Sequence, residues 1–192
     1  GGKTTITREL QRSMPNTEAL YFDDYDYDVA SGILDLCQWV EDGADYGLWN
    51  LQSLANEVHE LFSKIDPPND FIILDYPFAY KQKQLGKLID YAIFIDTPLD
   101  IAMARRILRD FPRDSPVTIH EDMNGYLTRG RSAYLHMLDT IKPDSDFVVD
   151  GSLPIETIVD ILQNKLNAVQ ATREQRKVGS ETQCDSEPFT AS

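Results

Sequence analysis

The chain has 192 residues, of which 18 are lysine or arginine and 32 are aspartate or glutamate. The resulting formal net charge of −14 argues against a surface that binds the phosphates of nucleic acid or of anionic lipid. Its apolar runs are also far shorter than the roughly 20 residues of a membrane-spanning helix. We therefore expect neither nucleic acid nor a membrane as a partner.

Two cysteines, Cys37 and Cys184, lie far apart in the sequence, and the second lies in a polar stretch. Such a pair indicates neither a disulfide framework nor a metal cluster. We expect a reducing compartment, most simply the cytoplasm.

The order of apolar segments predicts an α/β fold with a mostly parallel sheet, because short β-rich runs alternate with longer stretches of helical spacing. Strands are predicted over 19–22, 71–75, 92–96 and 147–150. Helical spacing of apolar residues follows over 48–62, 101–108, 126–138 and 155–162. We expect one domain over 1–166, followed by a polar, disordered tail over 167–192.

The chain opens with a segment that matches part of a phosphate-binding loop. Gly2-Lys3-Thr4 fits the end of the motif G-x-x-x-x-G-K-[ST], and the residues that follow can form a helix. In this motif the backbone N–H groups surround phosphate oxygens, the lysine reaches the outer phosphates and the hydroxyl ligates Mg²⁺. We expect nucleotide contacts from Gly1, Gly2, Lys3, Thr4 and Thr5, and we expect the first glycine of the motif and its preceding strand to lie before residue 1. The alternative is a polar N-terminus without a role.

An acidic segment, Asp23-Asp24-Tyr25-Asp26-Tyr27-Asp28, follows the first predicted strand. Carboxylates at the carboxyl end of a parallel strand face the crevice where α/β proteins bind ligands, and one of them could accept a proton from a substrate hydroxyl. We favour Asp24 first and Asp23 second, with aromatic residues lining a pocket for a sugar or base. A calcium loop starting at Asp24 is the weaker alternative, because Val29 occupies its required glycine position. The other alternative is a solvated acidic loop without a role, which is the account that we favour for most of these six residues.

The strand predicted over 71–75 ends in Asp75, the position at which phosphate-loop proteins hold Mg²⁺ directly or through water. A carboxylate that merely caps the turn at Tyr76-Pro77 is the alternative.

Four arginines cluster after the strand predicted over 92–96, namely Arg105, Arg106, Arg109 and Arg113. Guanidinium groups bind phosphate oxygens and neutralise charge during phosphoryl transfer. We favour phosphate contact for Arg105 or Arg109 over a solvated face that pairs with Asp100 and Asp110.

Together these segments resemble the uridine kinase and phosphoribulokinase group of P-loop kinases. The resemblance rests on Gly-Lys-Thr-Thr, Tyr21-Phe22-Asp23-Asp24-Tyr25, Ile73-Leu74-Asp75-Tyr76-Pro77 and Asp96-Thr97-Pro98, followed by Arg105-Arg106-Ile107-Leu108-Arg109-Asp110. It covers roughly residues 1–165. The chain departs from the uridine kinases at Asp75-Tyr76-Pro77, where they carry Glu-Gly, and this leaves the phosphate acceptor open.

The resemblance implies a three-layer α/β/α kinase fold with a helical lid, and ATP with Mg²⁺ as donor. It also implies roles for individual residues. Asp24 would activate the acceptor, Asp75 would lie near Mg²⁺, the four arginines would belong to the lid, and Gly151 would lie beside the adenine.

We therefore expect an ATP-dependent kinase that phosphorylates a hydroxyl group of a small molecule, either a nucleoside or a sugar phosphate. Lys3, Asp24 and Arg109 are the expected catalytic residues, and Asp23, Asp24, Tyr25, Tyr76 and Arg106 are the expected acceptor contacts. We also name a homo-oligomer, formed by copies of this chain, as an assembly to expect. The alternatives are a nucleotide-binding NTPase with a regulatory or partner-binding role and, less favoured, a kinase acting on RNA ends.

Overall fold

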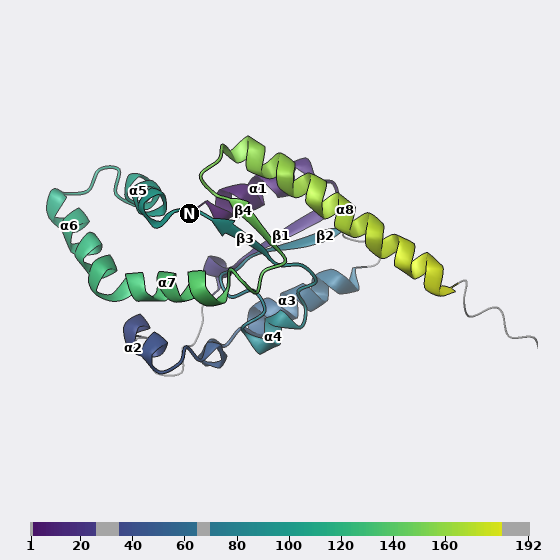
Figure 1. The fold of residues 1–192 in the computed structure, drawn as a ribbon, viewed down its shortest axis with the longest axis horizontal. Helices are drawn as coiled ribbons and strands as arrows, with labels where there is room; N and C mark the ends of the chain where they lie inside the picture. Colours follow the sequence, from purple (N-terminus) through teal and green to yellow (C-terminus); the bar gives the residue numbers. More distant parts are fainter. Residues whose placement is uncertain (1, 26–34, 65–69, 182–192) are drawn as a thin grey trace, which may run out of the picture. The chain divides into compact units, whose positions relative to one another are not determined.

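The fold is described from a computed structural model, in which residues 2–25, 35–64 and 70–181 are described (Figure 1). Gly1 and the acidic residues Asp26 and Asp28 lie outside these ranges. The chain divides into two compact units, residues 1–153 and 154–192, and each is described by itself.

The first unit alternates helices and strands as its sequence predicts. Its first half contains α1 (Lys3–Ser13), β1 (Thr17–Tyr21), the 3-10 turn η1 (Phe22–Asp24), α2 (Leu36–Glu41), the 3-10 turn η2 (Tyr46–Leu48), α3 (Gln52–Ser63) and β2 (Phe71–Asp75). Its second half contains α4 (Lys83–Gly86), β3 (Ile93–Asp96), α5 (Leu99–Asp110), α6 (Pro116–Gly125), the π-helical turn η3 (Tyr126–Gly130), α7 (Arg131–Thr140) and β4 (Phe147–Asp150).

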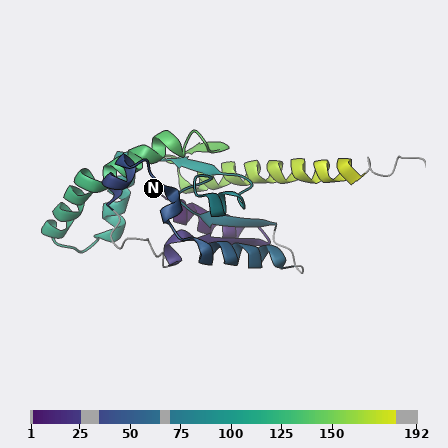
Figure 2. The same ribbon diagram turned by 90° about the horizontal axis from the view of Figure 1, so that it is seen from below.

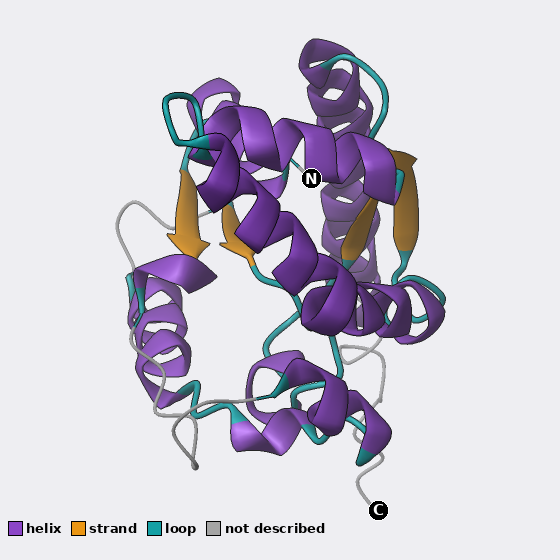
Figure 3. Cartoon of the chain, turned by 90° about the vertical axis from the view of Figure 1, so that its left-hand side faces the viewer, coloured by secondary structure: helices purple, strands orange, loops and turns teal. Residues whose placement is uncertain are grey.

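The four strands form two parallel pairs rather than one continuous sheet (Figure 3). β1 pairs with β2, with Tyr21 opposite Asp75, and β3 pairs with β4, with Asp96 opposite Asp150. The mixed α/β class and the parallel pairing are confirmed. The predicted single sheet is replaced by two pairs, because among the described residues no strand hydrogen-bonds to both β2 and β3.

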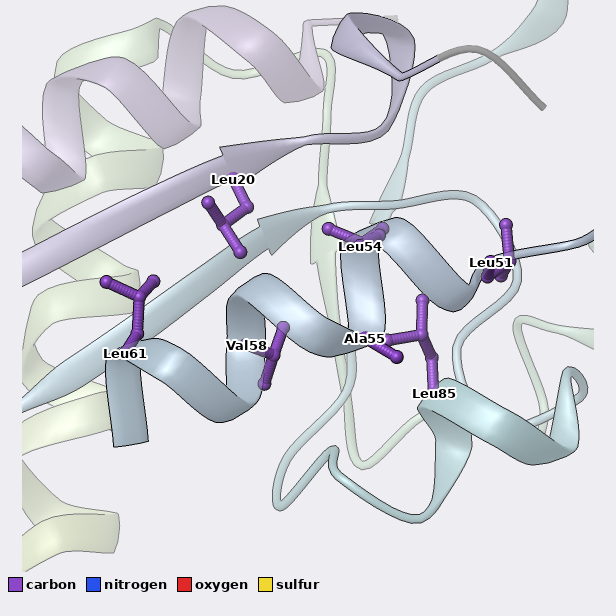
Figure 4. Packing of buried hydrophobic residues seen from close by; sticks show 7 residues of the cluster. All are labelled: Leu20, Leu51, Leu54, Ala55, Val58, Leu61 and Leu85. Atoms are coloured by element: carbon purple, nitrogen blue, oxygen red, sulfur yellow. The ribbon is translucent and has the colours of Figure 1, made fainter. Parts of the chain in front are cut away.

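Helices cover both faces of the β1–β2 pair, with α1 on one side and α3 on the other (Figure 2). On the α3 side, buried residues from β1, from α3 and its N-cap residue, and from α4 form one apolar cluster, which consists of Leu20, Leu51, Leu54, Ala55, Val58, Leu61 and Leu85. Figure 4 shows Leu20 pointing from β1 toward α3. The cluster fixes the strand pair whose carboxyl ends carry Asp24 and Asp75.

An aromatic cluster forms a second core beside the same strand ends. It is built from Trp39, Ala44, Tyr46, Phe78 and Ile141. The ring of Phe22 packs against both clusters and lies 5.5 Å from the ring of Phe78, edge to face. The residue directly before Asp23 is therefore held by both cores.

Helices α5, α6 and α7 follow one another away from the strands and back again (Figure 1). η3 joins α6 to α7, and π-helical turns occur rarely and often at functional sites. The Cys37 thiol donates to two carbonyl groups of this turn, those of Thr128 at 3.4 Å and Arg129 at 3.2 Å. The turn is thereby joined to α2.

A tyrosine outside both cores connects the loop after β2 to the start of β4. The Tyr80 hydroxyl donates to the Asp146 carboxylate, which also accepts the backbone N–H of Ala92 at 2.8 Å. Burial and the Asp146 carboxylate raise the pKa of Tyr80 to about 12.

The second unit contains α8 (Ile155–Glu181), which continues past the change of composition at residue 166. The predicted boundary of the domain at residue 166 stays a prediction. In the part of the chain that the structure describes, no helix is both long enough and apolar enough to cross a bilayer.

Removing a buried leucine from the first cluster tests the core. Leu54 is 1% exposed, so Leu54→Ala should lower the free energy of unfolding by about 2–5 kcal/mol through lost burial and the cavity that remains. Urea denaturation measures this loss. Phe62→Ala is the control, because Phe62 lies on the same helix but is 55% exposed, and we expect a change of about 0.5 kcal/mol or less. Equal losses in the two variants would contradict the assigned core.

The raised pKa of Tyr80 predicts how stability changes at alkaline pH. Between the ordinary pKa of 10.0 and the folded value of about 12, the folded state keeps a proton that the unfolded state has lost. The stabilisation from Tyr80 is therefore complete below pH 10 and decreases as the pH rises toward 12. Denaturation at a series of pH values should show a shallower loss for Tyr80→Phe than for the parent chain. Identical slopes would contradict the assigned hydrogen bond.

Candidate functional site

The centre of the candidate site is the contact between the start of α1 and the end of β2. The Thr4 hydroxyl donates to the Asp75 carboxylate at 2.5 Å, and the Lys3 ammonium lies 3.9 Å from the other carboxylate oxygen. The Asp75 side chain is 7% exposed, whereas that of Lys3 is 50% exposed. A lysine with an accessible ammonium group and a hydroxyl–carboxylate pair therefore meet at the N-terminus of a helix.

Gly2 gives this helix terminus its shape. Its φ of 100° lies in the left-handed region, which residues with a Cβ adopt at a cost, and no side chain caps the first N–H groups of α1. Backbone N–H groups at a helix N-terminus attract anions. The geometry therefore suits a phosphate group beside Lys3.

The predicted acceptor carboxylates lie at the neighbouring strand end. Asp23 and Asp24 form η1 directly after β1, both are exposed, and β1 is the strand paired with β2. Because parallel strands end at the same edge, the structure brings these two carboxylates to the edge that Asp75 occupies.

The two predicted aromatic contacts, Tyr25 and Tyr76, are both half-buried. Tyr25 donates its hydroxyl proton to Glu57 of α3, and the ring of Tyr76 lies 5.9 Å from that of Phe22. Both residues flank η1, so each can support the position of Asp23 and Asp24.

Three of the predicted arginines make contacts within the protein. Arg105 donates to the carbonyl of Gly151 at 2.8 Å, and Arg106 pairs with Asp122 of α6 and, at 3.8 Å, with Asp110. The alternative of a solvated arginine face predicted an ion pair with Asp110. The sequence did not predict the ion pair with Asp122. Asp122 lies 16 positions from Arg106, so no helical spacing indicated the pair.

Arg109 is more accessible than Arg106, with a side chain 71% exposed against 32%. It donates to the Asp110 carboxylate at 2.5 and 2.8 Å, and this contact, followed by the charges of Asp110 and Asp23, raises the pKa of Arg109. The same contact lowers the pKa of Asp110.

The remaining predicted contacts are Thr5, Arg113 and Gly1. Arg113 and Thr5 are exposed, and Gly1 lies outside the described residues. The structure brings together Lys3, Thr4 and Asp75 directly.

Gly151 packs against the end of β3, which is a constraint that the sequence did not reveal. Its N–H donates to the Asp96 carbonyl at 2.9 Å, and a Cβ atom on it would lie 2.0 Å from the Thr97 hydroxyl. The predicted adenine-side role of Gly151 stays a prediction, and a glycine is required at this position for packing alone.

A mostly apolar cavity lies beside this site, with about 150 Å³ of interior space. Lys3 lines it together with residues of β3, α5 and α7, among them Ile93, Ile95, Leu99 and Met137. The candidate lysine therefore faces a space that a ligand could enter.

The donor set at α1 and β2 is suitable for magnesium. Mg²⁺ prefers hard oxygen ligands and is commonly bound by one or two protein groups together with phosphates and water. The Thr4 hydroxyl and the Asp75 carboxylate are such ligands and already touch each other. In the described part of the chain, no group of three or more His, Cys, Asp or Glu side chains is arranged as a metal site.

Comparison with known proteins gives distant relatives that share one name. No protein-family model matches the chain. Proteins named uridine kinase from Staphylococcus haemolyticus and Staphylococcus aureus strain JH9 are 24% and 25% identical, in alignments covering 88% of this chain and 91% of each relative. A uridine kinase from Macrococcus caseolyticus is 28% identical over 53% of this chain and 49% of its own length, so the match spans about half of that relative. These similarities support a uridine kinase-like family of P-loop kinases and a kinase-like function at that level.

The close approach at Gly151 can be tested by adding one methyl group. Gly151→Ala should lower the free energy of unfolding by about 1–3 kcal/mol, because the new Cβ overlaps Thr97 and approaches Ile95 within 2.9 Å. Gly130→Ala is the matched control, since its Cβ would lie 3.6 Å from Tyr126, an ordinary contact. Chemical denaturation of both variants measures the difference. Unchanged stability of Gly151→Ala would contradict the packing role.

Proposed function

We propose that the chain is an ATP- and Mg²⁺-dependent kinase that transfers the γ-phosphoryl group to a hydroxyl group of a small molecule. The observation that carries the proposal is the joining of Thr4 and Lys3 to the buried Asp75 at the N-terminus of α1. The distant relatives named uridine kinase support the same reaction class.

The donor side is assigned to the start of α1. The N–H groups that follow Gly2 and the ammonium of Lys3 would bind the outer phosphates, because both present positive charge toward the same edge. Thr4 and Asp75 would hold Mg²⁺, which when bound neutralises negative charge on the phosphate oxygens. Burial of Asp75 and its hydrogen bond keep this ligand pair in place before nucleotide enters.

The acceptor side is assigned to η1. Asp24 would accept the proton of the acceptor hydroxyl while the hydroxyl oxygen bonds to the γ-phosphorus and the bond to the β-phosphate oxygen breaks, so that ADP leaves. Asp24 is exposed and follows the strand paired with β2, so it can reach a substrate bound at this edge. Asp23, Tyr25, Tyr76 and Arg106 would contact the acceptor or hold η1 in place.

The charge that develops during transfer would be neutralised from α5. Arg109 is accessible, because its side chain is 71% exposed. Arg105 of the same helix and Arg113, which follows the helix, would bind phosphate oxygens as well. Gly151, which accepts a hydrogen bond from Arg105, would lie beside the adenine. Guanidinium groups suit this role because they bind phosphate oxygens through two N–H groups.

The proposed acceptor is a nucleoside or a sugar-phosphate-like compound. Aromatic side chains, among them Phe22 and Tyr76, lie beside the acidic strand end, and they suit the planar or ring-shaped face of such a molecule. The name that these relatives share makes uridine the first compound to test.

Acceptor screening with a single-residue variant tests the proposal. ADP formation from ATP and Mg²⁺ should increase when the correct nucleoside or sugar phosphate is added, and Asp24→Asn should lower kcat by about 10²- to 10⁴-fold, because general base catalysis contributes this much. Lys3→Ala should reduce turnover as well, through lost phosphate binding. Asp42→Asn is the control, because Asp42 is an exposed carboxylate at the end of α2.

Two results would contradict the kinase assignment. Full phosphoryl transfer by Asp24→Asn would remove the assigned base, and full transfer by Lys3→Ala would remove the phosphate site. ATP hydrolysis that no hydroxyl compound stimulates would instead support a nucleotide-binding protein with a regulatory role.

A further inference from the structure

A series of charged side chains with alternating sign connects α6 to the accessible arginine of α5. Its members are Asp122, Arg106, Asp110 and Arg109, and each contacts the next in that order. Arg106 and Asp110 lie four residues apart on α5, whereas Asp122 belongs to α6. The ion pair between Asp122 and Arg106 therefore carries the series from one helix to the other.

Asp122 is the least accessible member of the series for which it forms the α6 end. Within α6, all of whose residues the structure describes, only Ile119, Asp122 and Gly125 are not exposed. One carboxylate oxygen of Asp122 accepts a hydrogen bond from Arg106, and the other is buried without a hydrogen-bond partner in the described part of the chain. Arg106 is thus the charge partner of Asp122, and separating the two would leave a partly buried charge uncompensated.

Arg106 contacts Asp110 as well as Asp122. Its Nη2 donates to Asp122, while its Nε lies 3.8 Å from Oδ2 of Asp110. The hydrogen bond from Arg109 contributes most to lowering the pKa of Asp110, and the charge of Arg106 lowers it further. Asp110 is therefore held as a carboxylate between two guanidinium groups.

Asp110 in turn sets the orientation of the Arg109 guanidinium. Its Oδ1 accepts from Nε at 2.5 Å and its Oδ2 accepts from Nη2 at 2.8 Å, so one edge of the planar group is used. A guanidinium carries further N–H groups in the same plane, and those not donated to Asp110 are directed away from it. This other edge can bind a phosphate group through two parallel N–H groups.

The exposed contact between Arg109 and Asp110 would fix this orientation only weakly by itself. Isolated ion pairs at a surface contribute little, unless the arginine contacts the carboxylate through two N–H groups or several charges form a network. Arg109 and Asp110 meet the first condition, and the connection to Asp122 meets the second. The orientation of Arg109 therefore depends on a residue of another helix.

We propose that Asp122 is a positioning residue for Arg109. Acting through Arg106 and Asp110, it keeps the guanidinium of Arg109 turned so that its outward N–H groups can bind a phosphate. The inference rests on the kinase activity proposed above, in which Arg109 neutralises charge during phosphoryl transfer. It assigns Asp122 no contact with nucleotide or acceptor.

Neutralising Asp122 tests the inference through the kinetics of the full chain. Asp122→Asn should lower kcat about tenfold and leave the KM for ATP within about twofold, because a displaced guanidinium loses contacts that are made in the transition state. Asp122→Glu keeps the charge and should recover most of the loss. Glu121→Gln is the matched control, because it removes an exposed carboxylate from the neighbouring position of α6 and should leave kcat unchanged.

A double variant tests whether Asp122 acts through Arg106. In a chain that already carries Arg106→Gln, the further change Asp122→Asn should lower kcat no more, because the two residues then belong to one broken connection. An equal loss in both backgrounds would overturn the inference.

The Nε–H group of Arg109 provides a readout that needs no catalysis. Its exchange with water, measured by NMR on the nucleotide-free chain, should be about threefold or more faster in Asp122→Asn than in the parent chain or in Glu121→Gln. Thermal unfolding checks that each variant folds, and Arg106→Gln breaks the same connection if Asp122→Asn does not fold.

The two readouts separate failure of the inference from failure of the proposed function. Unchanged exchange of the Arg109 Nε–H would overturn the inference, and so would faster exchange with an unchanged kcat. If the parent chain transfers no phosphoryl group to any acceptor, the proposed function fails, and the exchange measurement alone then decides whether Asp122 positions Arg109.

Discussion

The buried carboxylate of Asp75 is the interaction on which the candidate site depends. A carboxylate removed from water requires hydrogen bonds or a charge partner, and Asp75 obtains both from one turn of α1. The contact fixes the helix N-terminus against the strand end, so that the proposed phosphate-binding groups and the proposed magnesium ligands lie together. The contacts with Lys3 and Thr4 therefore offset the free energy cost of burying Asp75. The same contacts fix the positions of Lys3 and Thr4.

The acidic strand end is positioned by apolar packing instead. Phe22 joins the aliphatic cluster around α3 to the aromatic cluster around Phe78, and Asp23 and Asp24 follow it directly. The exposed side chains of Asp23 and Asp24 are thus kept in position by the packing of Phe22, the residue that precedes them. Within the first unit, a polar contact thus orders the proposed donor side, and aromatic packing orders the proposed acceptor side.

The sequence allowed the local elements to be predicted better than the contacts between them. The strands over 71–75 and 147–150 were predicted to the residue, since continuous apolar runs bounded by turns define them. Asp75 and Thr4 were each predicted as site residues from a motif, and these roles stay predictions, whereas their direct hydrogen bond was not predicted. The split sheet, the Arg106–Asp122 pair and the approach of Gly151 to Thr97 depend on residues far apart in the chain, which periodicity cannot relate.

The π-helical turn between α6 and α7 sets which side chains each helix directs inward. A residue of an α-helix advances by about 100° around the axis, and a π turn contains one residue more than an α turn. Across η3, exposed Met123 and Leu127 are succeeded by buried Ala133 and Ile141. Loss of a single residue from 126–130 would rotate the whole of α7 by about that angle, and the face that packs near Trp39 would turn toward water. The length of this one turn thus sets the rotation of α7 about its own axis relative to α6.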